Sequence, residues 1–240
     1  MENLRRLGGE AGVVAGMATA WLFVGLVFIF PSAGLQLADQ ANPHRYLPFV
    51  ARHSEMFWTI NILGGLAAAL LSAVTFLAIG DRFRDDAPAS ARIGSVAGVM
   101  GAAALAAAAL VRHISFGSLS SMYAANGASA AYAFYAVSAI VNSLAGLGHV
   151  AVGLGMLVFG NVMFRHRRYN NVGYLSVVAG TATVLAGFVI NAFTFALGTV
   201  SMTAWLIWTA LVMRGEAGPA WFRWGAAKVR ANGRAQRRAA

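Results

Sequence analysis

The sequence predicts an all-α integral membrane protein, a bundle of six transmembrane helices with both termini in the cytoplasm. Three features predict it: six long apolar stretches, a composition of 59% hydrophobic and 11% charged residues, and an alternating distribution of Lys and Arg between the stretches. So few charges leave too little polar surface to cover a water-soluble globule of 240 residues. We expect one transmembrane domain over residues 1–220, because no loop is long enough to fold by itself.

Each apolar stretch has the composition of a membrane-crossing helix. A helix needs about 20 residues to cross the hydrocarbon core, and most of the stretches reach that length. Apolar and polar residues hardly alternate along them, which argues against barrel strands. The expected helices are approximately 12–35, 57–80, 93–111, 132–164, 172–195 and 198–213.

The basic residues predict the orientation of the helices. Fifteen of the eighteen Lys and Arg residues lie before the first helix or after the second, fourth and sixth. The other gaps hold only Arg45, Arg52 and Arg112. The positive-inside rule therefore puts both termini in the cytoplasm, and we expect a multi-pass protein of a bacterial inner (cytoplasmic) membrane. The net charge of +10 then reflects loops that face anionic lipid headgroups, and no nucleic-acid partner is expected.

The two ends of the chain have separate interpretations. The first apolar stretch is expected to be a retained helix, because residues 21–30 continue it without a small-residue cleavage site. Residues 221–240 combine Trp221, Phe222 and Trp224 with six basic residues. This pattern predicts a cytoplasmic tail anchored at anionic headgroups, and the alternatives are a docking peptide for an acidic partner or an RNA-binding arm.

Two extracytoplasmic segments are longer than the other connections. Residues 36–56 contain Pro43 and Pro48, and they are expected to form either a short helix at the membrane interface or a plain connecting loop. Residues 113–131 are rich in Ser, Gly, Ala and Asn. Such small polar residues predict a mobile loop or lid.

Recurring glycines predict where helices pack. Gly94 and Gly98 form a small-xxx-small pair, and Gly173, Gly180 and Gly187 recur every seven residues. Lipid supplies no hydrophobic drive for helix association, so close backbone approach at small residues has to supply it. We expect these glycines to form packing seams within the molecule.

The fourth expected helix carries the most informative internal pattern. Its small and polar residues follow a 4-3-4-3-4 spacing, which places them on one face: Asn142, Gly146, His149, Gly153, Met156 and Gly160. His149 is expected near the middle of the span and should point into the bundle, because an imidazole facing lipid is costly. It either hydrogen-bonds to another helix or, with space left by the glycines, contacts a flat cofactor or lipid-like ligand.

Several other polar residues are expected on the extracytoplasmic side of the bundle, above a nearly apolar inner half. Together with His149 they predict an outward-opening pocket with His149 at its floor. The candidate ligand-binding residues are His149, Asn142, Asn61, Asn191, His113 and Arg112.

Several function classes are disfavoured by missing residues. Cysteine is absent, and the only lysine, Lys228, lies in the tail, so Cys-based metal sites and a retinal Schiff base have no residue to use. No carboxylate lies inside an expected helix, which disfavours a proton or cation pump. No metal or cofactor is predicted; the alternative is one haem or quinone held by His53, His113 or His149.

Two segments resemble a known family. A glycine-rich helix over residues 146–160 ends in the basic turn 165–168, and the next helix opens with Tyr174 and Leu175 before Gly180. This arrangement resembles the paired-helix signature of a bacterial multi-pass family known only as a domain of unknown function. The loop that leads into a helix with Asn61 near its start, residues 38–61, is also similar. The resemblance implies six or more helices and no specific activity.

The favoured function is a non-enzymatic inner-membrane protein. It either binds a hydrophobic or amphipathic small molecule in the outward-facing pocket or serves as an accessory subunit of a larger membrane complex, with homo-oligomers included among the expected assemblies. The alternatives are a membrane-embedded haem or quinone oxidoreductase subunit and a small-molecule transporter, although no internal repeat supports a transporter.

Overall fold

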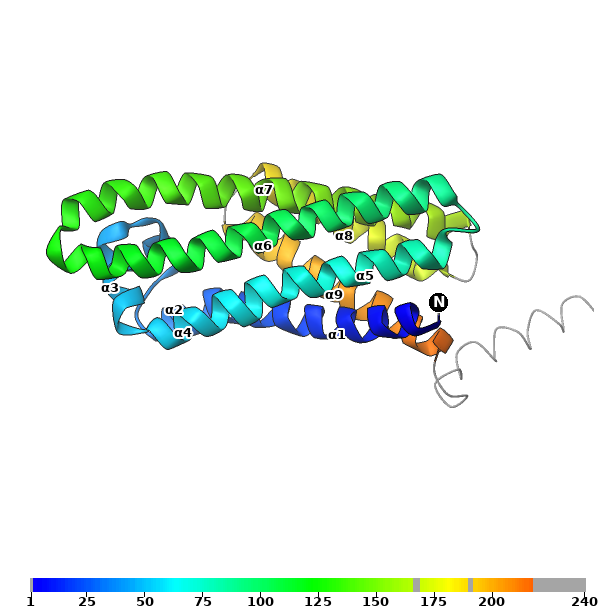
Figure 1. The fold of residues 1–240 in the computed structure, drawn as a ribbon, viewed down its shortest axis with the longest axis horizontal. Helices are drawn as coiled ribbons and strands as arrows, with labels where there is room; N and C mark the ends of the chain where they lie inside the picture. Colours follow the sequence, from blue (N-terminus) through cyan, green and yellow to red (C-terminus); the bar gives the residue numbers. More distant parts are fainter. Residues whose placement is uncertain (1, 166–168, 190–191, 218–240) are drawn as a thin grey trace, which may run out of the picture.

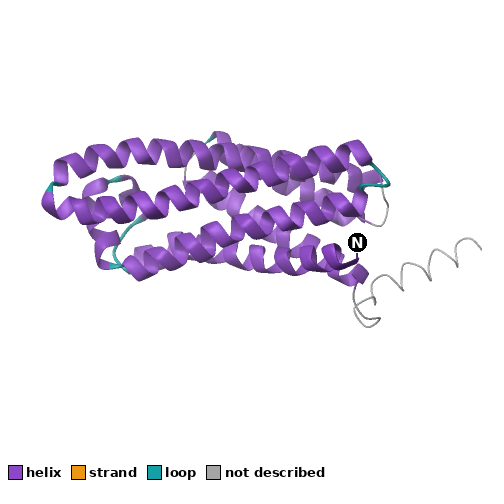
Figure 2. Ribbon diagram, in the orientation of Figure 1, coloured by secondary structure: helices purple, strands orange, loops and turns teal. Residues whose placement is uncertain are grey.

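The computed structural model shows long helices lying side by side along one axis (Figure 1). It describes residues 2–165, 169–189 and 192–217, and within these residues it contains helices and short connections but no strand (Figure 2). Six helical stretches in this part of the chain are long and apolar enough to cross a membrane. The all-α class and the six apolar helices are therefore confirmed. Asn191 and the expected tail, residues 221–240, lie outside the described residues.

The six stretches are continuous rods, two of which contain π-helical turns. The first rod is α1 (Glu2–Val24), the π-helix η1 (Gly25–Ile29) and α2 (Phe30–Ser32). The second is α4 (Ser54–Trp58), the π-helix η3 (Thr59–Ala67) and α5 (Ala68–Phe83). Single helices form the rest: α6 (Pro88–Ala125), α7 (Gly127–Arg165), α8 (Asn170–Phe188) and α9 (Ala192–Ala217). The 3₁₀-helix η2 (Leu37–Ala41) and α3 (Pro43–Arg52) connect the first two rods.

The rods form a closed ring. Each rod packs against the next along the chain, and α1 packs against α9 to close the ring. The N-terminus and the α5–α6 turn lie at one end, called here the terminal end, and the α6–α7 connection at Asn126 lies at the other, the hairpin end (Figure 1). Arg5 of α1 pairs with Asp81 of α5 at 3.4 Å, and Arg84 pairs with the same carboxylate at 3.3 Å. Arg5, which lies before the first expected helix, and Arg84, which follows the second, are therefore close together at the terminal end.

The rods differ greatly in length. The 19 residues of α8 span about 28 Å at 1.5 Å per residue, close to the roughly 30 Å of a hydrocarbon core. The 38 residues of α6 and the 39 of α7 span almost 60 Å at the same rise, roughly twice that thickness. The α6–α7 hairpin therefore extends well past the end of α8 at Phe188 (Figure 1).

The expectation of a mobile loop over residues 113–131 is wrong. Helices α6 and α7 fill this segment except at Asn126, whose side-chain Oδ1 accepts from the Ser129 N–H at 3.1 Å and caps α7. The small residues of this segment are compatible with helix, and Phe116 and Leu119 are buried, so the segment packs as part of a core. The local composition predicts a loop, but the segment forms helix because Phe116 and Leu119 are buried in the tertiary structure.

Helix α3 explains that burial. Of the two expectations for residues 36–56, a short helix is the one observed: Asn42 accepts from the His44 N–H at 3.0 Å, and Pro43 occupies the first turn. Its buried face packs against α6 and α7, and the His44 Nδ1 lies 2.8 Å from the Tyr123 hydroxyl. The resulting hairpin-end core contains Leu26, Phe30, Leu35, Tyr46, Leu47, Phe49, Val50, Phe57, Ile60, Phe116, Leu119, Ala130 and Phe134.

A second core lies toward the terminal end. Phe76 of α5 stacks on Trp205 of α9 and on Phe159 of α7, with ring centroids 5.1 and 6.2 Å apart. The Trp205 Nε1–H donates to the Ser176 Oγ of α8 at 2.7 Å. Four helices therefore meet in this terminal-end core, and the space between the two cores is where a cavity remains.

The predicted glycine seams are confirmed as contacts within the molecule. A Cβ on Gly153 of α7 would lie 2.7 Å from the Gly180 carbonyl oxygen of α8, and one on Gly187 would lie 2.6 Å from the Gly146 carbonyl oxygen. A Cβ on Gly98 of α6 would overlap the Phe76 ring. These helices approach so closely that only glycine fits at the crossings.

Replacing Gly153 with Ala should destabilise the bundle, whereas Gly117→Ala should not. The new Cβ at position 153 meets the α8 backbone, and overpacking of this kind costs about 1–3 kcal/mol. Position 117 has no neighbour within 4 Å, so the change there should stabilise by about 0.4–1 kcal/mol through the unfolded chain. Thermal unfolding in neutral detergent measures both. Equal melting temperatures for the two variants would contradict the seam.

Candidate ligand pocket

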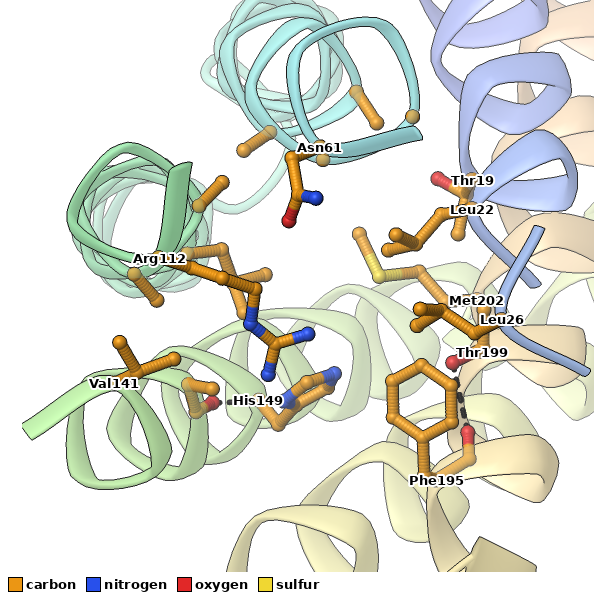
Figure 3. Close-up of a pocket in the computed structure, with 18 residues that line it drawn as sticks. Thr19, Leu22, Leu26, Asn61, Arg112, Val141, His149, Phe195, Thr199 and Met202 are labelled. Atoms are coloured by element: carbon orange, nitrogen blue, oxygen red, sulfur yellow. Dashed lines mark hydrogen bonds between the residues drawn. The ribbon is translucent and has the colours of Figure 1, made fainter. Parts of the chain in front are cut away.

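A cavity of about 100 Å³ lies inside the ring, between the two cores. Five of the six rods supply its walls, and α8 supplies none of the lining residues. Most of the lining is apolar, but three strongly polar side chains reach it from different rods: Asn61, Arg112 and His149 (Figure 3). The fold therefore brings together three of the six candidate residues, which are up to 88 positions apart in the sequence.

The π-helix η3 places Asn61 at the cavity. Its amide Nδ2 donates to the Phe57 carbonyl oxygen at 2.8 Å, and within the described part of the chain its Oδ1 accepts no hydrogen bond, so it can accept from the cavity side (Figure 3). Gly64 and Gly65 follow Asn61 in η3, and a Cβ on Gly64 would lie 3.0 Å from Leu22 of α1. Gly64 thus lets α1 approach η3 closely, and both glycines line the cavity without a side chain of their own. π turns are frequent at functional sites.

His149 points from α7 into the cavity. Its Nδ1 lies 2.7 Å from the Ala145 carbonyl oxygen. Because a carbonyl only accepts, Nδ1 carries the hydrogen, and the other ring nitrogen, Nε2, has a free lone pair in the neutral ring. Figure 3 shows this second nitrogen directed away from Ala145. His149 therefore does not use its ring to bridge two helices, and Nε2 remains available to a ligand.

Arg112 brings a permanent positive charge to the same space. Its guanidinium group extends from α6 toward the His149 ring (Figure 3). Within residues 2–165, 169–189 and 192–217, Arg112 has no ion pair and no hydrogen bond. Burial raises the pKa of the nearby Tyr46 hydroxyl, and the Arg112 charge only partly opposes that shift. Tyr46 stays neutral at pH 7, so it does not act as a counter-ion.

The cavity lies closer to the hairpin end than the expected central position of His149 implies. Gly187, next to the last residue of α8, packs against Gly146 and Val150 of α7. The level of His149 is thus within about one turn of the end of α8, the shortest rod. Leu26 belongs both to the cavity wall and to the hairpin-end core, so that core lies on the hairpin side of the cavity.

The other candidate residues lie elsewhere. His113 stacks on Phe57 with ring centroids 5.8 Å apart, and its Nδ1 is buried without a hydrogen-bond partner. His53 packs on Phe49 with ring centroids 4.6 Å apart. Neither histidine lines the cavity, and Asn142 is exposed on α7. Of the three histidines considered for haem or quinone, only His149 is at the cavity.

Several lining residues had no distinctive signal in the sequence. The hydroxyls of Thr19 and Thr199 donate to carbonyl oxygens of their own helices at 2.7 Å, and Phe195 and Met202 are ordinary apolar residues. One feature of the sequence does indicate that the η3 segment lines a cavity. Gly64 and Gly65 follow Asn61 by three and four residues, which places small residues on the same helix face as the amide.

Comparisons with protein-family models, curated proteins and solved structures found no match to this chain. The resemblance of residues 146–180 to a family of unknown function therefore adds nothing to the functional argument. The proposed function therefore rests on the chemistry of the cavity.

Replacing Arg112 with Met should stabilise the ligand-free protein. A cation without a partner in a mostly apolar cavity is costly, and an apolar side chain of similar length removes that cost. We expect the melting temperature of delipidated Arg112→Met to rise by a few degrees, since about 1 kcal/mol shifts a domain of this size by about 2–4 °C. Arg52→Met is the control, because Arg52 is exposed and its loss should have little effect. A lower melting temperature for Arg112→Met would show that Arg112 has a structural partner.

Proposed function

We propose that this chain is a multi-pass protein of the cytoplasmic membrane that binds an amphipathic small molecule in the cavity between its two cores. The observation that supports binding is the convergence of Asn61, Arg112 and His149 on one mostly apolar cavity. Each of the three has hydrogen-bonding capacity that its own helix does not use. Apolar walls with a few converging polar groups are the usual composition of a small-molecule site.

The size of the cavity supports a particular kind of ligand. Its volume of about 100 Å³ is below the roughly 300 Å³ at which pockets for drug-sized molecules begin. A polar head and its first carbons fit such a space, and the rest of the molecule would lie along the apolar helices. An amphipathic ligand satisfies both requirements.

The alternatives draw less support from the same residues. An accessory subunit needs a helix face that is complementary to another protein, and the exposed apolar side chains of α1, α6 and α7 serve equally well as lipid-facing surface. A haem or quinone oxidoreductase subunit would have His149 alone at the cavity. We therefore favour binding over catalysis.

We further propose that the terminal end faces the cytoplasm. The basic residues of alternate gaps support this orientation through the positive-inside rule. The described helices bring Arg5, Arg82, Arg84 and Arg165 to that end, because α1 and α6 begin there while α5 and α7 end there. The hairpin end, with its α3 cover, then lies on the extracytoplasmic side.

Filling the cavity should remove the ligand. Ala108 is buried and lines the cavity, so Ala108→Leu places three further carbon atoms in it; Ala103→Leu is the matched control, because Ala103 is exposed on the same helix. Mass spectrometry of organic extracts of the purified proteins should find an amphipathic species in the wild type and in Ala103→Leu, reduced at least about tenfold in Ala108→Leu. Equal amounts in all three would contradict the proposed site.

An absorption spectrum of the same samples tests the haem alternative. A Soret band in wild-type protein that is lost in His149→Leu would show that the cavity binds haem and not the proposed amphiphile.

Cysteine labelling tests the orientation directly, because the chain has no cysteine of its own. Ser121 is exposed near the hairpin end and Ala89 is exposed near the terminal end. In whole cells, a membrane-impermeant maleimide should modify Ser121→Cys and leave Ala89→Cys unmodified until the membrane is opened. The reverse pattern would place the hairpin end in the cytoplasm.

A further inference from the structure

We propose that the cavity binds the oxyanion head, a carboxylate or a phosphate, of a single-chain amphiphile, with Arg112 as its counter-ion. This inference rests on the proposed function and specifies the ligand class of the same site. The charge, the hydrogen-bonding groups, the position and the size of the cavity support it.

The charge of the cavity sets the sign of the ligand. Arg112 brings a guanidinium cation to the cavity, and none of the described carboxylates pairs with it. An uncompensated cation inside a membrane bundle is costly unless a ligand or water solvates it. A cationic head would add like charge, and a neutral head would leave the guanidinium unpaired. An oxyanion supplies the missing charge and accepts two parallel N–H hydrogen bonds from the guanidinium fork.

The other two polar groups fit an oxygen-rich head. The free Nε2 of His149 accepts from the hydroxyl of a singly protonated phosphate, and a bridging water can link it to a carboxylate, which has no hydrogen of its own to donate. The Asn61 Oδ1 accepts from a bridging water between it and the head. Figure 3 shows the Arg112 guanidinium and the His149 ring directed toward one another, so one small head can reach both.

The position of the cavity fits a headgroup better than a fully buried molecule. His149 lies at the level of Gly187, close to the end of the shortest rod, α8. A helix of that length just spans the hydrocarbon core, so its end marks the depth at which lipid heads begin. Beside the polar groups the wall is formed by Leu22, Leu26 and Met202, which can hold the first carbons of a chain.

The volume limits the number of chains. A cavity of about 100 Å³ accepts a carboxylate or phosphate monoester with a few methylenes, and it cannot also enclose a glycerol backbone with two acyl chains. The same head chemistry can come from a free fatty acid or alkyl phosphate, or from the exposed phosphate of a membrane phospholipid. The experiment has to separate these two sources.

The test uses full-length protein, delipidated in neutral detergent, and four probes with the same twelve-carbon chain: dodecanoate, dodecyl phosphate, dodecanol and dodecyltrimethylammonium. Binding is measured by tryptophan fluorescence and by the rise in melting temperature. Dodecanoate and dodecyl phosphate should bind roughly thirtyfold or more tightly than dodecanol, as expected when a desolvated charge gains its partner. Dodecyltrimethylammonium should not bind measurably.

Arg112 variants show whether the preference comes from this residue. Arg112→Met should bind dodecanoate and dodecanol equally, Arg112→Lys should keep part of the preference for dodecanoate, and Arg52→Met should behave as the wild type. Since Arg112→Met is expected to fold, loss of the preference would not reflect misfolding. A preference for dodecanoate that survives in Arg112→Met would overturn the inference.

The outcomes separate the head group from the site itself. If dodecanol binds the wild type as tightly as dodecanoate and Ala108→Leu weakens both, the anionic head is wrong and the proposed binding function stands. If none of the four probes binds, or Ala108→Leu changes nothing, the proposed function fails as well.

A competition arm identifies the source. Displacement of dodecanoate when the protein is moved from phosphatidylcholine to phosphatidylglycerol nanodiscs would assign the oxyanion to a membrane lipid and overturn the single-chain part of the proposal. Retention of dodecanoate in both would support a free amphiphile.

Discussion

The close approach of glycine backbones between α7 and its neighbours is the constraint on which the rest of the structure depends. Association in lipid gains nothing from hiding apolar side chains, so the ring must be held by contacts that only close packing provides. Gly153 against Gly180 and Gly187 against Gly146 set both the distance and the relative height of α7 and α8. That height places His149 beside the end of α8.

The two cores differ in kind, and the cavity results from the difference. The terminal-end core is a stack of Phe76, Trp205 and Phe159 inside the ring, whereas the hairpin-end core depends on α3 packing under the extended α6–α7 hairpin. Between them, small residues and π-helical turns leave space that no large side chain fills. A polar group can persist there because it faces a cavity and not lipid.

The six apolar helices were predictable, and so was the direction of Asn61 and His149 into the bundle, but His149 lies nearer the hairpin end than the expected middle of the span. Their convergence with Arg112 was not fully predictable: Arg112 was expected at the end of the third helix, and it lies instead two thirds of the way along a 38-residue α6. Residues 113–131 were expected to form a loop. They form helix because Phe116 and Leu119 pack against α3, a contact between segments more than 60 residues apart. His113 and His53 were equally reasonable candidates by sequence, and both pack against phenylalanine rings.

By itself the sequence determined the class and the number of apolar helices, and it predicts the side of each loop. Those properties depend on sums over local stretches: the apolar length needed to cross the bilayer and the count of basic residues in each gap. Only the tertiary structure decided how far α6 and α7 extend, which turns widen into η3 and which polar side chains share one cavity. These properties depend on the rotation, height and spacing of whole helices, and contacts such as Gly187 with Gly146 set them across long sequence separations.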